Sequence, residues 1–176
     1  MSPLVSRVVV RQLERPIVVM GVAGAGKSAV GAELARRLGR DFIEGDDHHP
    51  PENLDKMAAG LALTDEDRWP WLERLADLLE RQQRAGRPAV LSCSALRRCY
   101  RDRLRRAMPV FFVHLVATAE LLDARLAARA DHFMPRSLLP SQLATLEPLE
   151  PDEPGVVLDA SKPLPDVVDQ ALQALG

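Results

Sequence analysis

The chain has 176 residues, of which 47% are hydrophobic and 27% are charged, proportions that are typical of one folded domain and unlike those of a disordered or fibrous protein. Its formal net charge of −2 disfavours a protein that coats polyanions, and no apolar run approaches the roughly 18–20 residues of a membrane-spanning helix. The two cysteines, Cys93 and Cys99, form neither a disulfide framework nor a zinc-type spacing, so we expect a soluble cytoplasmic protein without a membrane partner.

Residues 1–15 show no periodicity and are predicted to be an extension before a single domain over residues 16–176. Short apolar runs predict strands at 16–20, 42–43, 88–93, 110–116 and 156–158. Amphipathic stretches predict helices at 29–38, 52–59, 64–85, 96–107, 119–130 and from Pro163 or Pro165 to Leu175. This alternation predicts an α/β fold, in which a parallel sheet of about five strands carries helices on both faces.

The segment GVAGAGKS, residues 21–28, matches the phosphate-binding pattern G-x-x-x-x-G-K-[ST] without a mismatch. Its glycines allow backbone N–H groups to turn inward around phosphates, Lys27 offers an ammonium to the β and γ oxygens, and Ser28 offers a hydroxyl to Mg²⁺. A predicted strand precedes the segment and a predicted helix follows it, as this motif requires. We therefore predict a nucleotide cradle made of Gly21, Val22, Ala23, Gly24, Ala25, Gly26, Lys27 and Ser28.

The few lysines narrow the class of nucleotide-binding protein. Only three of the 23 basic residues are Lys, namely Lys27, Lys56 and Lys162, and none of them lies in the Asn-Lys-x-Asp motif of guanine-nucleotide switches. The chain also lacks a run of four apolar residues ending in Asp-Glu, which many motor and remodelling ATPases carry. These features favour a small-molecule kinase.

A loop rich in acidic residues and histidine follows the predicted strand at 42–43. Ligands of open α/β sheets bind beyond the carboxyl ends of the strands, so a carboxylate in the loop Gly45-Asp46-Asp47-His48-His49-Pro50 could accept a proton from an acceptor hydroxyl or hold a water of Mg²⁺. From position alone, a solvated turn is the commoner interpretation of such a loop.

Several ordered motifs resemble those of the bacterial gluconokinases, P-loop kinases that use ATP to phosphorylate D-gluconate on its 6-hydroxyl. The resemblance covers about nine-tenths of the chain, from Ile17 onward. The matching motifs are Met20-Gly21-Val22, Gly45-Asp46 with His49-Pro50, Asn53 with Lys56-Met57, Leu63 to Arg68 before Pro70-Trp71-Leu72, Cys93 to Leu96 with Tyr100-Arg101, His132-Phe133-Met134, Ser141-Gln142 and Thr145-Leu146-Glu147. Shikimate kinases and adenylate kinases share the architecture but not this set of motifs.

The resemblance implies ATP and Mg²⁺ as cofactors, D-gluconate as substrate, a homodimer and no nucleic acid. It implies catalytic roles for Lys27, Asp46 and Arg125, and metal ligation by Ser28 and Asp46. A small lid at about 125–150 would bring Arg125 and Arg129 onto the phosphates. Substrate-binding residues would be Asp46, His49, Arg68, Arg97, Arg101 and His132. Whether Asp46 is the general base or a metal ligand stays open.

Some of these arginines also have simpler explanations. Arg68 can grip a carboxylate through two parallel hydrogen bonds, but it can equally pair with Asp65 or Asp67. Arg97 and Arg101 are four residues apart and could face the substrate, whereas Arg125 and Arg129 could form a salt-bridged surface. Six arginines between 97 and 106 also leave open a nucleotide- or RNA-binding regulator, although a solvated helix face is favoured because no aromatic array accompanies them. The nearest alternative is another small-molecule P-loop kinase of the shikimate-kinase type.

Overall fold

The computed structural model describes residues 14–129 and 135–176 of the chain. A parallel five-stranded sheet runs through its centre, in the spatial order β2-β3-β1-β4-β5. The strands are β1 (Ile17–Met20), β2 (Phe42–Glu44), β3 (Val90–Ser92), β4 (Phe111–Val116) and β5 (Gly155–Asp159). The predicted α/β fold with a parallel sheet of about five strands is confirmed.

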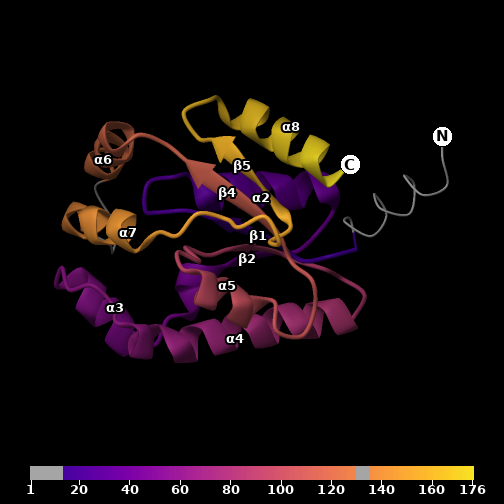
Figure 1. Ribbon diagram of the computed structural model, residues 1–176, viewed down its shortest axis with the longest axis horizontal. Helices are drawn as coiled ribbons and strands as arrows, with labels where there is room; N and C mark the ends of the chain where they lie inside the picture. Colours follow the sequence, from indigo (N-terminus) through magenta and orange to yellow (C-terminus); the bar gives the residue numbers. More distant parts are fainter. Residues whose placement is uncertain (1–13, 130–134) are drawn as a thin grey trace.

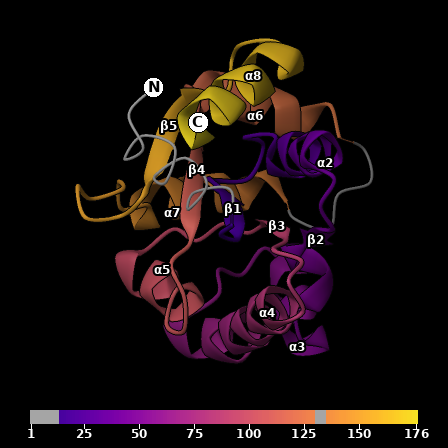
Figure 2. The same ribbon diagram turned by 90° about the vertical axis from the view of Figure 1, so that its right-hand side faces the viewer.

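Helices cover both faces of the sheet, as Figures 1 and 2 show. The helices of the described residues are α2 (Lys27–Leu38), α3 (Pro51–Ala58), α4 (Asp65–Arg84), α5 (Arg98–Leu104), α6 (Ala119–Ala127), α7 (Leu139–Thr145) and α8 (Leu164–Leu175). Helices α2 and α8 lie on one face and α4 and α5 on the other, while α6 and α7 gather at the left of Figure 1, beyond the carboxyl ends of the strands. In the part of the chain that the structure describes, no helix is long and apolar enough to span a membrane.

The central position of β1 explains its composition. It is hydrogen-bonded to β3 on one side and to β4 on the other, and all four of its residues are 0% exposed. A parallel strand that is covered on both faces needs apolar residues at successive positions instead of alternate ones, which is the pattern of Ile-Val-Val-Met.

Helix α4 begins where the sequence predicts, because a capping box between Thr64 and Asp67 terminates the helix at its N-terminal end. The N–H of Asp67 donates to Thr64 Oγ1 at 3.1 Å, and the N–H of Thr64 donates to Asp67 Oδ2 at 2.9 Å. Both bonds satisfy N–H groups that the first turn of a helix leaves without partners.

Helix α5 is shorter than the predicted 96–107. Ala95 has a φ of 47°, a left-handed conformation that is uncommon outside glycine, and Arg97 is still extended at φ −105° and ψ 151°. The helix can therefore begin only at Arg98, and it ends at Leu104.

Arg101 on α5 points into the protein interior instead of toward a substrate. Its side chain is 0% exposed, its Nε lies 2.7 Å from Glu153 Oε1, and its Nη2 lies 3.0 Å from Glu153 Oε2. It also donates to the backbone carbonyls of Ala95, Leu96, Glu147 and Pro148. Arg101, which the resemblance assigns to the substrate, does not line the pocket in this structure: its guanidinium ties the loop after β3 and the segment before β5 to α5, and it supports the unusual conformation of Ala95.

We expect Glu153→Gln to destabilise the protein strongly, by about 3–5 kcal/mol, because it leaves the Arg101 guanidinium buried without a counter-charge. The midpoint of urea unfolding measures this effect. The control is Glu33→Gln on α2, which weakens surface ion pairs with Arg36 and Arg37 and should lower the midpoint only slightly. Equal midpoints for Glu153→Gln and the unmodified protein would contradict the structural role of the pair.

Candidate active site

The cradle 21–28 lies between β1 and α2, at the carboxyl edge of the sheet. Gly24 has a φ of 83°, and a Cβ atom there would lie 2.9 Å from the carbonyl oxygen of Leu122, so this position requires glycine. Helix α2 begins at Lys27 and has no acidic residue in its first turn. Its N-terminal N–H groups and its dipole therefore favour an anion at the cradle.

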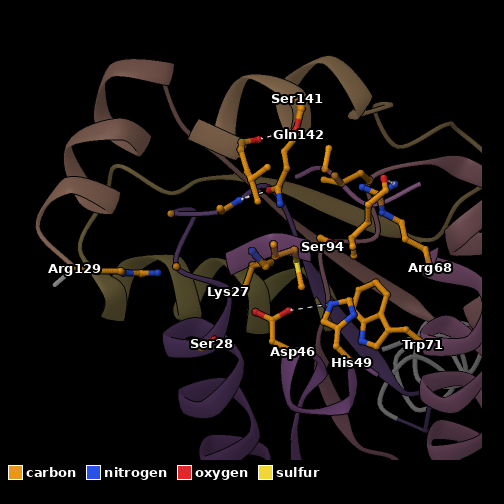
Figure 3. A pocket seen from close by; sticks show the side chains of 18 residues that line it. Lys27, Ser28, Asp46, His49, Arg68, Trp71, Ser94, Arg129, Ser141 and Gln142 are labelled. Atoms are coloured by element: carbon orange, nitrogen blue, oxygen red, sulfur yellow. Dashed lines mark hydrogen bonds and ion pairs between the residues drawn. The ribbon is translucent and has the colours of Figure 1, made fainter. Parts of the chain in front are cut away.

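Lys27 lies inside the cradle, and its Nζ donates to the carbonyl oxygen of Val22 at 3.0 Å. Burial lowers the pKa of this ammonium, and the negative charge of Asp46 opposes the shift. Figure 3 shows the two side chains facing each other across one pocket. A buried cation beside a carboxylate is suited to receive the negative oxygens of a phosphate.

Asp46 is presented by a 3₁₀ helix, Gly45–His48, that directly follows β2. This turn packs tightly against β3, because a Cβ atom at Gly45 would overlap the carbonyl oxygen of Ser92. On its other side, Trp71 Nε1 of α4 donates to the carbonyl oxygen of Gly45 at 2.8 Å. The carboxylate is thus held at the pocket by contacts to two other elements.

His49 follows that turn and lines the same pocket. Its ring stacks on Trp71 with a centroid distance of 4.0 Å and an interplanar angle of 15°, and its Nε2 lies 3.9 Å from Asp46 Oδ1. Burial and, to a lesser degree, the charge of Arg68 lower the pKa of His49 to about 4. The imidazole is therefore neutral at physiological pH.

Arg68 on α4 also reaches this pocket, and its side chain is 13% exposed. Its Nη1 donates to the carbonyl oxygen of Leu63 at 2.6 Å and to Tyr100 Oη at 3.2 Å, and its guanidinium lies over the Tyr100 ring at 5.4 Å from the centroid. The expected pairing with Asp65 is weak, at 3.9 Å. Neighbours therefore hold Arg68 in place while it faces the cavity.

Gln142 on α7 lines the pocket on the side opposite Asp46 (Figure 3). Its Oε1 accepts a hydrogen bond of 2.7 Å from the backbone N–H of Ala23 in the cradle, as the dashed line in Figure 3 shows, and the neighbouring Ser141 lines the pocket too. Sequence reasoning gave Gln142 no role, although its place in the Ser141-Gln142 motif marked the segment. An amide oxygen on a cradle N–H occupies a position at which a phosphate oxygen can bind.

A second hollow lies on the other side of the cradle and shares Gly24, Gly26 and Arg129 with the first. Arg125 lines this second hollow and not the first: it donates to the carbonyl oxygens of Gly24 at 3.4 Å and Ala160 at 2.6 Å. Arg129 borders both cavities. These two arginines therefore flank the cradle, and only Arg129 faces the side that holds Asp46.

Arg97, another predicted substrate residue, is not brought into the pocket. Arg97 binds Asp65 Oδ2 at 2.9 Å and lies near Glu147, while His132 falls outside the described residues. The remaining arginines of the 97–106 stretch pair with surface carboxylates. Arg98 pairs with Asp102, Glu150 and Asp152, and Arg105 pairs with Asp102. Arg103 pairs with Glu73, and Arg106 pairs with Glu73, Asp77 and Glu80. These carboxylates balance the positive stretch that had suggested a nucleic-acid partner.

Ser28 and Asp46, the predicted metal ligands, both line the first pocket. Among residues 14–129 and 135–176, no group of three or more His, Cys, Asp or Glu side chains could hold a metal ion. This donor set is compatible with Mg²⁺, which keeps several waters and binds through one or two carboxylates together with substrate phosphates.

Several known proteins are similar to this chain in sequence and in fold. A family described as an AAA domain matches residues 17–149. The chain is 54% identical over 160 residues to a gluconokinase of Gluconobacter oxydans (strain 621H), which covers 90% of this chain and 89% of that protein. The crystal structure of a gluconokinase from Sinorhizobium meliloti 1021 has a TM-score of 0.84 at 47% identity, covering 93% of this chain and 92% of that chain. The crystal structure of a sugar kinase from Janibacter sp. HTCC2649 has a TM-score of 0.88 at 49% identity, covering 92% of this chain and 94% of that chain.

The buried histidines predict how stability depends on pH. Burial, with a smaller contribution from Arg101, also lowers the pKa of His114 to about 4, as for His49, from an unfolded value near 6.5. Between these two pH values both histidines are protonated in the unfolded chain but stay neutral in the folded chain. The free energy of unfolding should therefore keep its full value above about pH 6.5 and decrease as the pH falls toward 4. Each histidine lowers it by at most about 1.4 kcal/mol per pH unit.

Urea unfolding at about pH 7 and about pH 5 tests this expectation. His114→Leu should lessen the fall between the two pH values, because one buried neutral imidazole is removed while the apolar surroundings are kept. An undiminished fall in that variant would show that His114 does not contribute.

Proposed function

This chain belongs to the gluconokinase family of P-loop kinases, and we propose that it transfers the γ-phosphoryl group of ATP to the 6-hydroxyl of D-gluconate, giving 6-phospho-D-gluconate and ADP. The observation that carries the proposal is one pocket in which Lys27 of the cradle, Asp46 of the acceptor loop and Arg68 of α4 face a common space. The phosphates of ATP would bind Lys27, the hydroxyl of the acceptor would bind Asp46, and the carboxylate of the acceptor would bind Arg68.

The cradle and the second hollow would divide the nucleotide between them. The phosphates lie on residues 21–28, where inward N–H groups and Lys27 meet their charge, and the nucleoside extends into the hollow beside Arg125. Arg129 borders both cavities and can reach the transferring group as its charge redistributes. When Mg²⁺ is bound, through the Ser28 hydroxyl and Asp46, it supplies further charge stabilisation at the phosphates.

The acceptor would lie between Asp46 and Arg68. Arg68 binds the carboxylate of gluconate, because a guanidinium offers two parallel donors to two carboxylate oxygens. At the opposite end of the substrate, Asp46 holds the 6-hydroxyl and accepts its proton as the oxygen attacks phosphorus in line with the leaving group. Gln142 and Ser141 of α7 cover the space from above in Figure 3, which limits access of water as a competing acceptor.

The proposal extends to two properties that the family resemblance implies, a homodimer and a cytoplasmic location. Sedimentation equilibrium of the purified protein measures the first, and fractionation of the source cells measures the second.

The substrate is tested by an ADP-release assay over sugar acids, shikimate and nucleoside monophosphates. Gluconate should give the highest kcat/KM, because Arg68 and Asp46 together require a carboxylate and a distant hydroxyl on one molecule. Shikimate has both groups on a rigid ring and is therefore the most stringent competitor. A higher kcat/KM for shikimate or AMP than for gluconate would refute the substrate.

Lys27→Ala should lower kcat by at least ~10²-fold, because it removes the ammonium that stabilises the charge of the transferring phosphoryl group. Circular dichroism should show that the variant remains folded. Arg36→Ala, an exposed change on the same helix, is the control and should retain full activity. Near-normal turnover by Lys27→Ala would contradict the role of the cradle.

A further inference from the structure

The side-chain amide of Asn53 joins the acceptor loop to the start of α4. Asn53 is 4% exposed on α3, and its Nδ2 lies 2.8 Å from the backbone carbonyl oxygen of Asp67 and 3.2 Å from His49 Nδ1. A carbonyl oxygen can only accept hydrogen bonds, so the NH₂ group, and not the oxygen, of the Asn53 amide must face Asp67.

This orientation determines which nitrogen of His49 carries the proton. The NH₂ group has two hydrogens, one directed at the Asp67 carbonyl and the other at His49 Nδ1. Nδ1 must then offer its lone pair as an acceptor, and in a neutral imidazole the proton resides on Nε2. An imidazolium donates from both nitrogens, so a ring that accepts a hydrogen bond at Nδ1 is neutral.

The protonated nitrogen points toward the reacting groups. His49 Nε2 is 3.9 Å from Asp46 Oδ1, which is too long for a direct hydrogen bond. It is short enough for one hydroxyl oxygen to lie within hydrogen-bond distance of both atoms. Such a hydroxyl would accept from Nε2–H and donate to the carboxylate, so both of its hydrogen-bonding functions would be used (Figure 3).

We propose that Asn53 is a positioning residue that holds His49 as a neutral Nε2–H donor to the oxygen of the acceptor hydroxyl, and thereby leaves Asp46 as the group that takes the proton. In this step the hydroxyl oxygen bonds to the γ-phosphorus while the bond from phosphorus to the β–γ bridging oxygen breaks. The electron pair of that bond leaves with ADP, and the hydroxyl proton passes to Asp46. His49 cannot compete as a base, because Asn53 occupies its available lone pair.

The role of His49 in the reaction rests on the proposed function, but its protonation state does not and can be observed without turnover. Long-range ¹H–¹⁵N spectra of the full-length, ¹⁵N-labelled protein distinguish the two imidazole tautomers, and His49→Gln identifies the signals of this ring. The unmodified protein should show the Nε2–H form. Asn53→Asp replaces the donor to Nδ1 with an acceptor and should shift His49 to the Nδ1–H form or to the imidazolium.

An Nδ1–H tautomer in the unmodified protein would overturn the proposal, and so would identical His49 spectra in the unmodified protein and Asn53→Asp. If the spectra agree with the proposal but gluconate is not phosphorylated, the assigned substrate fails while the tautomer assignment stands. The two failures are therefore distinguishable.

Kinetics separate positioning from a general loss of structure. Asn53→Asp should lower kcat with gluconate by about 10²-fold and leave the KM for ATP unchanged, because only the acceptor side is altered. Asp55→Asn, an exposed change on the same helix, is the matched control and should retain full activity.

The double variant Asn53→Asp/His49→Gln provides a further criterion. A glutamine amide carries its own donor whatever Asn53 does, so Asn53→Asp should cost little once His49 is replaced by Gln. The same fold loss in both backgrounds would show that Asn53 acts on stability alone, and would overturn the positioning role.

Discussion

The parallel pairing of β1 with β3 and β4 is the constraint on which the active site depends. Together with the parallel pairing of β2 with β3, it brings the ends of β1, β2 and β3 to one edge of the sheet, so that the loops after them meet. Backbone contacts then join these loops: the N–H of Gly21 donates to the carbonyl oxygen of Ser94 at 3.3 Å, and Gly45 lies directly against Ser92. The distance between phosphate cradle and acceptor loop is therefore set by sheet register and not by flexible side chains.

Charge balance within the pocket follows from this rigid framework. Burial disfavours the ammonium of Lys27, and Asp46 partly offsets that cost before any phosphate binds. Phosphate oxygens replace part of this compensation, which frees Asp46 to interact with the acceptor hydroxyl. Arg68, by contrast, is held by the Leu63 carbonyl and by Tyr100, so its positive charge stays directed at the cavity. Among the described residues that line the pocket, Asp46 is the only carboxylate beside the cations Lys27, Arg68 and Arg129, which suits a reaction that releases a single proton from the acceptor hydroxyl.

Much of the fold and the cradle could be predicted because their signals are local. Five apolar runs mark the strands, and residues 21–28 carry a contiguous motif. Contacts between distant segments leave no such signal. Arg101 has the same spacing from Arg97 as a substrate pair would have, yet its partner Glu153 lies 52 residues away. Gln142 reaches the N–H of Ala23 across 119 residues, and only folding reveals that contact.

The first turn of α4 shows how a device for stability becomes part of the acceptor site. Asp67 caps the helix with its side chain and binds Lys56 at 2.7 Å, while its backbone carbonyl orients Asn53 and, through it, His49. A capping interaction contributes about 1 kcal/mol to a helix. Here it also fixes the position of a carbonyl oxygen on which the protonation of a pocket histidine depends. A substitution that removes the cap should therefore alter the acceptor side as well as destabilise the helix.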